Sequence, residues 1–245
     1  MLKRTRVPHE ATNHPRTIDA GNFFKEYHGH PLELLETVYS RLAPTADFTI
    51  FLAGDSSMDN KHWFFNGPDK ASQLYKEDRS RADYFIGEAV NGYESVLKPP
   101  KAVQDVSYWM NTIAAERTKS PGKIVTINCA VEESTVGQRV DLAAKGGSGL
   151  LPHDEFVRDH LGGNDVVVLS LGGNDVALRP TAATVASVFA LTSMPMAVLQ
   201  ALGRFSPGFS HLESLFHTEI ERIVQRMVVG QEAVEEEKEE EEEEE

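Results

Sequence analysis

The chain has 245 residues, of which 40% are hydrophobic and 25% charged, and its formal net charge is −14 at pH 7. This composition is typical of a folded globular protein and excludes collagen-like, coiled-coil and fully disordered chains. Residues 231–245 contain eleven Glu and one Lys, which leaves a charge of only −4 for residues 1–230. We therefore expect no basic nucleic-acid-binding face, and the single cysteine, Cys129, excludes an internal disulfide.

The N-terminal segment starts with basic residues, but no run of about 7–15 apolar residues follows them, as a secretory signal would need. We predict that residues 1–20 form a disordered arm. A transit peptide is the alternative, because few acidic residues follow the basic start. An intracellular, cytoplasmic protein is the resulting expectation.

Hydrophobic patterning predicts strands that alternate with helices. Helices are expected over residues 32–43, 101–119, 136–145 and 210–229, and buried strands over residues 47–54, 123–131 and 165–171. The rest of the region between residues 61 and 121 is interrupted by Gly and Pro, which predicts loops and short helices. The alternation indicates an α/β fold with a parallel sheet covered on both faces, in one domain over residues 21–229.

Residues 180–203 form an uncharged stretch that raises the question of a membrane. A spanning helix needs about 20 predominantly apolar residues. This stretch contains six Ser, Thr and Gln residues, and Pro195 lies in its middle. We therefore expect no membrane span but a buried or pocket-lining pair of helices, broken near Pro195.

The hexapeptide LGGNDV occurs twice, at residues 161–166 and 171–176. The first copy precedes a predicted strand and is expected to form the turn that leads into it. The second follows the same strand at its carboxyl end, where ligands bind in open parallel sheets. If one copy is functional, it should be the second, and Asn164 should lie at the opposite end of the strand.

Two short motifs follow predicted buried strands: GDSS at residues 54–57 and GGND at residues 172–175. Alone, each is a good turn or helix cap. Together they place a serine hydroxyl and an asparagine amide at strand ends, where backbone and amide N–H groups can stabilise an oxyanion. We predict that Ser56 and Asn174 follow adjacent parallel strands and face one cleft.

In this order and strand context, FTIFLAGDSSMDN and VVVLSLGGNDVAL resemble blocks I and III of the SGNH, or GDSL-type, hydrolases. The resemblance covers residues 47–175. It implies a three-layer α/β/α, flavodoxin-like fold, hydrolysis of a small-molecule carboxylic ester through an acyl-enzyme, and neither a cofactor nor a metal.

The resemblance also implies the roles of individual residues. Ser56 would be the nucleophile and, through its backbone N–H, one donor of the oxyanion hole. Asn174 would be the second donor, through its side-chain amide. Asp55 would be a structural acid that fixes the turn, and Gly54 and Gly173 would support the two motifs.

The chain departs from the family at its second block. Glu133 stands where the family has the Gly whose N–H completes the oxyanion hole, and Gly137 could replace that Gly only through a different loop. A carboxylate beside a forming oxyanion would be repelled, so we expect Glu133 to point away. The third donor stays unassigned.

The second departure concerns the catalytic base, which the family carries in a D-x-x-H block near the end of the domain. No Asp follows Asp175 here, and the later histidines, His211 and His217, fall on a predicted helix. A serine without a base is a poor nucleophile. The D-x-x-H formed by Asp59 and His62 lies too close to the nucleophile, so His62 is expected to cap or to pack.

Other histidines and aromatic residues are expected to be structural. His153 and His160 lie on a polar predicted helix and should be solvated. Four aromatic residues could line an acyl pocket, but core packing is the preferred interpretation: Trp63, Phe64, Phe65 and Trp109.

The family has five parallel strands, whereas only three are found here, so we expect a domain that is shortened at its C-terminal end. Residues 230–245 are expected to be a solvated low-complexity tail, or alternatively an arm that binds a basic protein. The sequence thus predicts an SGNH-type esterase with impaired turnover. The alternatives are a binding module that lost its base and an interaction protein with an acidic arm.

Overall fold

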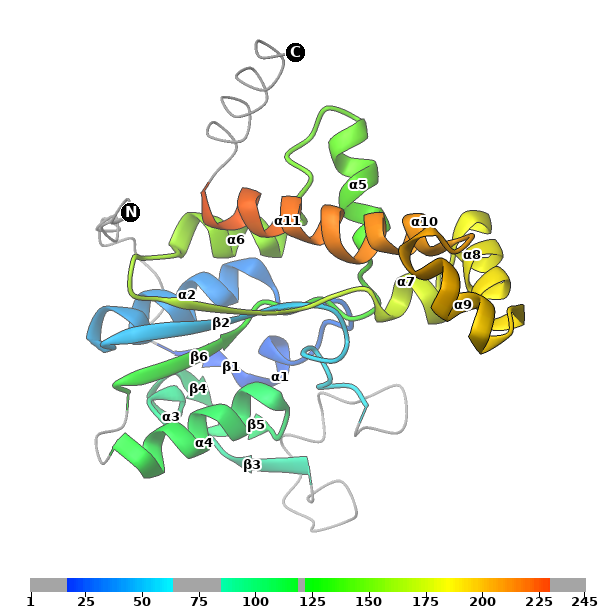
Figure 1. Ribbon diagram of the computed structural model, residues 1–245. Coiled ribbons are helices and arrows are strands. Elements are labelled where there is room, and N and C mark those ends of the chain that lie inside the picture. Colours follow the sequence, from blue (N-terminus) through cyan, green and yellow to red (C-terminus); the bar gives the residue numbers. More distant parts are fainter. Residues whose placement is uncertain (1–16, 64–84, 119–121, 230–245) are drawn as a thin grey trace. The chain divides into compact units, whose positions relative to one another are not determined.

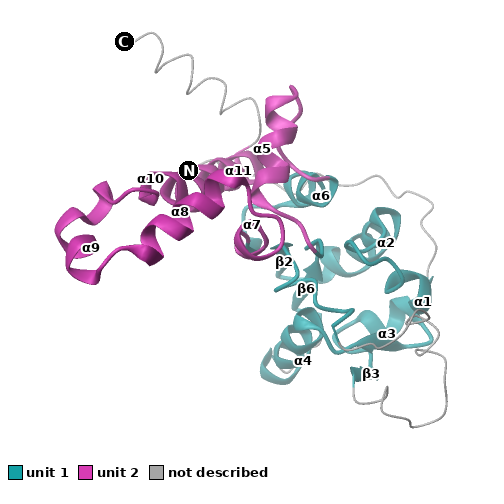
Figure 2. Ribbon diagram, turned by 90° about the vertical axis from the view of Figure 1, so that its right-hand side faces the viewer, with its two compact units in different colours: residues 1–132, 152–170 teal, residues 133–151, 171–245 magenta. Residues whose placement is uncertain are grey.

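The computed structural model describes residues 17–63, 85–118 and 122–229 (Figure 1). The chain divides into two compact units, one of residues 1–132 and 152–170 and one of residues 133–151 and 171–245 (Figure 2). The acidic tail and most of the predicted N-terminal arm lie outside the described residues.

The first unit is built on a parallel sheet of three strands in the order β6-β2-β7. These strands are β2 (Phe48–Gly54), β6 (Ile124–Asn128) and β7 (Val166–Ser170). The central strand β2 buries Phe51, Leu52 and Ala53 completely, as expected of a strand that reads as one apolar run. All three predicted strands and the α/β class are confirmed.

Helices lie on both faces of this sheet, with α2 and α6 on one face and α4 on the other (Figure 1). The helical elements of the unit are α1 (Ala20–Phe23), α2 (Leu32–Leu42), the 3-10 turn η1 (Ala43–Thr45), α3 (Tyr93–Val96), α4 (Val106–Thr118) and α6 (Pro152–His160). Helix α2 buries the stripe formed by Leu35, Val38 and Leu42, as its period of three to four residues predicts.

Four short strands complete the first unit and correct two predictions. Strand β1 (Ile18–Asp19) pairs in parallel with β4 (Leu97–Lys98), so the predicted arm over residues 1–20 is wrong at its end. Strand β3 (Ile86–Glu88) pairs antiparallel with β5 (Lys101–Val103), so the helix predicted from residue 101 begins only at Val106.

Two histidines of α6 that were expected to be solvated are packed against the sheet side of the helix. His160 is buried, stacks on Phe156 with ring centroids 4.1 Å apart, and places Nε2 2.9 Å from the Glu36 carboxylate. Nε2 of His153 lies 2.7 Å from the carbonyl oxygen of His30. Residues 153, 156 and 160 recur at helical spacing, so both histidines share the buried stripe of Phe156.

The second unit is helical in its described part. Its elements are α5 (Val136–Ala144), α7 (Gly173–Ala177), α8 (Ala182–Ser193), α9 (Met196–Leu202), the 3-10 turn η4 (Gly203–Phe205), α10 (Phe209–Glu213), the π-helical η5 (Ser214–Thr218) and α11 (Glu219–Val228). The helix predicted over residues 210–229 is thus present, with a π-helical segment inside it. The helical spacing of its apolar residues predicts one inward stripe, but Phe216 and Val224 of that stripe are exposed, and only Ile223 and Met227 are buried.

The predicted pair of helices broken near Pro195 is confirmed as α8 and α9, but its predicted burial is wrong. Helix α8 buries only Thr184 and Ser187, and α9 buries no residue. No single described helix is long and apolar enough to cross a membrane. Residues 182–193 and 196–205 pass that test only together, and the two segments are bent by 113°.

Candidate functional site

The turn that carries Ser56 begins at Gly54, the last residue of β2. Gly54 has a φ of 116°, and a Cβ atom there would overlap the carbonyl oxygen of Ser170 on the neighbouring strand. The N–H of Asp55 donates to the same carbonyl oxygen at 2.9 Å. Only glycine allows this left-handed conformation and this close approach, so Gly54 fixes the direction in which the chain leaves the sheet.

Asp55 holds the turn closed from within. Its buried carboxylate accepts hydrogen bonds from the N–H of Ser57 at 3.0 Å and from Ser57 Oγ at 2.8 Å. Its carbonyl oxygen accepts from the N–H groups of Met58 and Asp59, both at 3.0 Å. The segment is a turn rather than the helix N-terminus that was expected, and turns continue to Trp63.

Ser56 itself is half-buried at the outer side of this turn. Neither its Oγ nor its backbone N–H has a hydrogen-bond partner among the described residues of its unit. The N–H is therefore free to donate to a ligand oxygen. The hydroxyl, for its part, has no histidine beside it within these residues.

A buried charge cluster follows directly after the turn. The fully buried carboxylate of Asp59 lies 2.5 Å from Nζ of the equally buried Lys61. Its other oxygen accepts the N–H groups of Gly29 and Glu132, both at 2.9 Å. Because one carboxylate joins three segments that are distant in sequence, it fixes the loops around the Ser56 turn. Buried charges are tolerated only when paired and hydrogen-bonded in this way.

These contacts determine whether Asp59 and His62, which form the D-x-x-H motif, pair as a catalytic dyad. The Asp59 carboxylate is bonded to the three groups above and not to His62. Nε2 of His62 instead lies 2.8 Å from the carbonyl oxygen of Glu26, and the ring packs 5.4 Å from that of Tyr27. His62 thus packs, as expected, and does not form a dyad with Asp59.

Two further histidines of the first unit are held neutral. Burial, and then the positive charge of Lys61, place the pKa of His30 well below its usual value of 6.5, and burial also lowers the pKa of His153. His30 lines a cavity together with Phe23, Tyr93 and Asn128. Ser56 does not line this cavity, so it is not an acyl pocket for that residue.

Core packing was expected for four aromatic residues, and for the two that the structure describes it is wrong. Trp63 and Trp109 are both exposed, and Phe64 and Phe65 lie outside the described residues. The Trp63 indole N–H donates to the Glu132 carboxylate at 3.3 Å.

In the second unit, Asn174 lies in the first turn of α7. This helix starts from Gly172, which has a φ of 106°. One N–H of the Asn174 amide donates to the carbonyl oxygen of Ser134 at 3.0 Å. A side-chain amide has two N–H groups, and the second one of this half-buried residue has no partner among the described residues of its unit.

Asp175, the last residue of the GGND motif, caps the N-terminus of helix α5. Its buried carboxylate accepts the N–H groups of Val136 and Gly137, each at 2.8 Å, at the N-terminus of α5. Helix N-termini favour such negative charge. The N–H of Gly137 is thereby occupied and does not replace the third oxyanion donor.

Glu133 stands at the position where the resemblance calls for Gly. It has a φ of 60°, a conformation that favours glycine and is uncommon for other residues. Its carboxylate is paired with Arg179 at 3.1 Å. Glu133 thus adopts a left-handed backbone although it is not glycine, and its negative charge is paired with that of Arg179.

The two histidines that follow Asp175 lie on α10 and η5. Nε2 of His211 lies 3.0 Å from Thr184 Oγ1. His217 is exposed, 4.0 Å from the Glu221 carboxylate. Neither has an Asp partner, in agreement with the absence of Asp from this part of the sequence.

The sheet register relates the two motifs. Gly54 of β2 pairs with Ser170 of β7, so GDSS and GGND follow the carboxyl ends of adjacent parallel strands, as predicted. Ser56 belongs to the first unit and Asn174 to the second. That their side chains face one cleft stays a prediction.

Within residues 17–63, 85–118 and 122–229, no group of three His, Cys, Asp or Glu side chains is placed to hold a metal ion. Comparisons of the chain with protein-family models, curated proteins and solved structures find no match. The resemblance to the SGNH hydrolases therefore rests on the two motifs and their strand context alone.

Proposed function

We propose that the chain is a serine hydrolase of the SGNH type that acts on carboxylic esters through Ser56, with slow turnover. The single observation that carries this proposal is the register of β2 and β7. Because Gly54 pairs with Ser170, a serine turn and an Asn-Asp motif leave neighbouring strands at the edge where open parallel sheets bind ligands. A three-layer flavodoxin-like arrangement is part of the proposal.

Three local features support it. The N–H of Ser56 and one N–H of Asn174 are unused among the described residues, as oxyanion donors must be before a substrate binds. Asp55 fixes the serine turn through its carboxylate. Glu133 keeps a left-handed backbone at the position of the family's glycine.

In the proposed reaction, Ser56 Oγ attacks the ester carbonyl carbon, and the carbonyl oxygen becomes an oxyanion that the two N–H groups stabilise. Collapse of this intermediate breaks the ester C–O bond, and the alcohol leaves with the proton lost by Ser56. Water then hydrolyses the acyl-enzyme and restores the serine. General-base assistance contributes about 10²–10⁴-fold to such steps, and no described histidine of the first unit contacts Ser56.

Among the described residues of the first unit, no histidine is hydrogen-bonded to Ser56, which favours a second candidate, a non-catalytic binding module that retains the serine turn. The two candidates differ in whether Ser56 is nucleophilic. A binding module would hold an ester or a related oxygen-rich ligand at the same N–H groups without forming a covalent bond.

A fluorophosphonate probe separates them. We expect slow labelling of the chain, loss of labelling in Ser56→Ala, and retention in Ser57→Ala, which removes the neighbouring exposed hydroxyl. Peptide mass spectrometry should locate the adduct on Ser56. A chain that stays unlabelled at long times favours the binding module, whereas labelling that is lost in Ser57→Ala alone would contradict the choice of nucleophile.

A further inference from the structure

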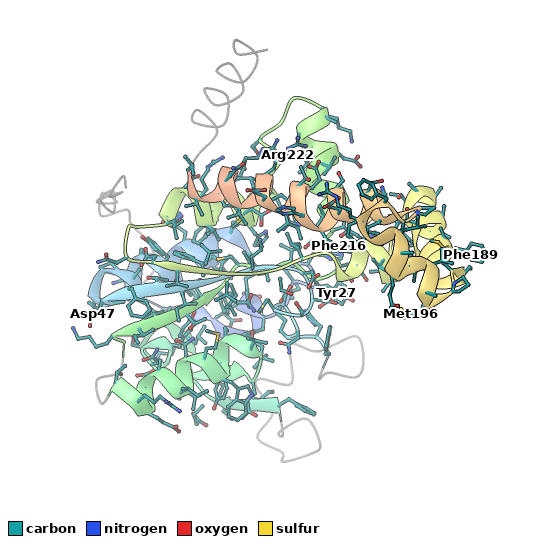
Figure 3. The ribbon with its side chains drawn as sticks, in the orientation of Figure 1. Tyr27, Asp47, Phe189, Met196, Phe216 and Arg222 are labelled. Atoms are coloured by element: carbon teal, nitrogen blue, oxygen red, sulfur yellow. The ribbon has the colours of Figure 1, made fainter. Side chains whose placement is uncertain are left out.

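The surface of α8, α9 and η4 exposes large apolar side chains. Phe205, Phe189 and Met196 are 81%, 70% and 68% exposed, more than any other large hydrophobic residue in the part of the chain that the structure describes. Phe189 and Met196 point outward from their helices (Figure 3). We call residues 182–205 the apolar hairpin.

The first half of α8 buries hydroxyl residues and exposes apolar ones, the reverse of a helix exposed to water, whereas Thr192 and Ser193 at its end are exposed. Its hydroxyl residues Thr184 and Ser187 are buried, and Thr184 Oγ1 lies 3.0 Å from His211 and 2.9 Å from Thr181. Val185 and Phe189, four residues apart on one stripe, are exposed instead. A helix segment that buries hydroxyl groups and exposes large apolar side chains fits an apolar environment outside.

The charge around the hairpin is also unusual for this chain. Residues 176–212 contain no Asp or Glu, although the whole chain carries −14. Of the two arginines in this range, Arg179 is paired with Glu133. Arg204 is exposed and lies 5.9 Å from the ring centroid of Phe205. An aromatic ring beside an arginine suits a lipid interface, where the ring enters the acyl region and the guanidinium binds a headgroup phosphate.

The length of α8 suits a helix that lies on a membrane surface and is too short for one that crosses the bilayer. The twelve residues of α8 are about 18 Å long at 1.5 Å per residue, whereas the hydrocarbon core of a bilayer is about 30 Å thick. The bend of 113° between α8 and the next helical segment also prevents one straight span. Short helices with exposed apolar residues can lie in the interface plane.

We propose that the apolar hairpin docks on the surface of a phospholipid bilayer, with Phe189 and Phe205 inserted and Arg204 on headgroup phosphate. Zwitterionic phosphatidylcholine is the expected lipid, because the acidic remainder of the chain disfavours an anionic surface. This inference does not depend on esterase activity.

Flotation of the full chain with phosphatidylcholine vesicles tests the proposal. We expect wild type to float, and Phe189→Ser/Phe205→Ser to lose more than about 10-fold in vesicle affinity, because burial of each aromatic side chain contributes at least that much. Trp109→Ser removes an exposed aromatic residue from α4, outside the apolar hairpin, and should float like wild type. Failure of wild type to float, or equal loss in Trp109→Ser, would overturn the proposal.

A second measurement tests the proposal if the Phe189→Ser/Phe205→Ser variant does not fold. Phe189→Trp in a chain whose two native tryptophans are replaced by Phe should show a blue shift of its emission when vesicles are added. An unchanged spectrum would overturn the proposal. So would sedimentation showing that the hairpin residues hold a dimer of this chain that does not bind vesicles.

Discussion

The two copies of LGGNDV adopt different structures although they share six residues and lie ten positions apart. In the first copy, Asp165 accepts the N–H groups of Thr49 at 2.7 Å and Gly162 at 2.8 Å, and the segment is a turn that leads into β7. In the second copy, Asp175 accepts the N–H groups of Val136 and Gly137, and the segment forms helix α7.

The comparison shows that the aspartate of each copy accepts backbone hydrogen bonds, but from different neighbours. In each copy one carboxylate accepts two backbone N–H groups. Which groups these are depends on whether the next element is a strand or a helix. The asparagine before it then differs too, since Asn164 is exposed and Asn174 is half-buried.

The largest expected effect separates the two asparagines. Asn174→Ala should slow fluorophosphonate labelling of Ser56 by about 10²–10³-fold, the usual result of losing one oxyanion donor. Asn164→Ala, at the other end of β7, should label at the wild-type rate. Labelling rates measured by gel fluorescence decide the matter, and equal rates in both variants would remove Asn174 from the oxyanion site.

The two aspartates provide the second comparison. Asp175→Ala leaves two N–H groups at the N-terminus of α5 unpaired in a buried position and should lower the free energy of unfolding by about 2–4 kcal/mol. Asp165 is only half-buried, so Asp165→Ala should lower it by about 1–2 kcal/mol. Urea unfolding followed by circular dichroism measures both, and a reversed order would show that burial does not set the difference.

Acidification should affect the unit that contains the first copy. The pKa values of His30 and His153 lie below 6.5 in the folded chain, so the unfolded chain binds their protons at higher pH. Their contribution to stability is present above about pH 6.5 and is lost as the pH falls below it, by about 1.4 kcal/mol per pH unit for each histidine that stays neutral.

Fluorescence can follow this loss, because both tryptophans, Trp63 and Trp109, belong to the first unit. Urea midpoints should fall between pH 7 and pH 5.5, and His30→Gln should flatten the dependence. A midpoint that is constant over this range would contradict the buried, neutral state of the two histidines.

The smallest effect concerns the glycines. Gly172→Ala should destabilise the chain by about 1 kcal/mol, because its φ of 106° is left-handed. A Cβ atom there would also lie 2.5 Å from the ring of Phe216, an exposed side chain that can move. Gly163→Ala, at an exposed position without a positive φ, should leave thermal unfolding unchanged, and an equal shift in both variants would argue against backbone strain.

The sequence predicts the long elements because their signals are local. Each main strand is a continuous apolar run, and α2 has a clear stripe. The two-residue and three-residue strands carry no periodicity, so they could not be found in this way. The late start of α4 did have a signal: Asp105, whose carboxylate accepts the N–H of Tyr108 at 2.8 Å, is a typical N-cap residue.

For a similar reason, the sequence predicts the turn of the candidate site but not the buried charge pair beside it. Gly54 and Asp55 act within the turn that contains them, so their positions follow from the motif. The buried pair of Asp59 and Lys61 depends on Gly29 and Glu132, which lie 30 and 73 residues away from Asp59. No local pattern reports such contacts, and charged residues are usually expected at the surface.

The division of the chain into interleaved units also sets an order of events during synthesis. Helix α5 belongs to the second unit, and it packs against α11, where Arg226 closely approaches Gly149 (Figure 2). Residue 229 is made 78 residues after residue 151, which takes roughly 4–16 s at about 5–20 residues per second. During that interval α5 has been synthesised, whereas α11, the helix against which it packs, is not yet complete. A chaperone that protects nascent chains would therefore find its binding window between these two points of translation.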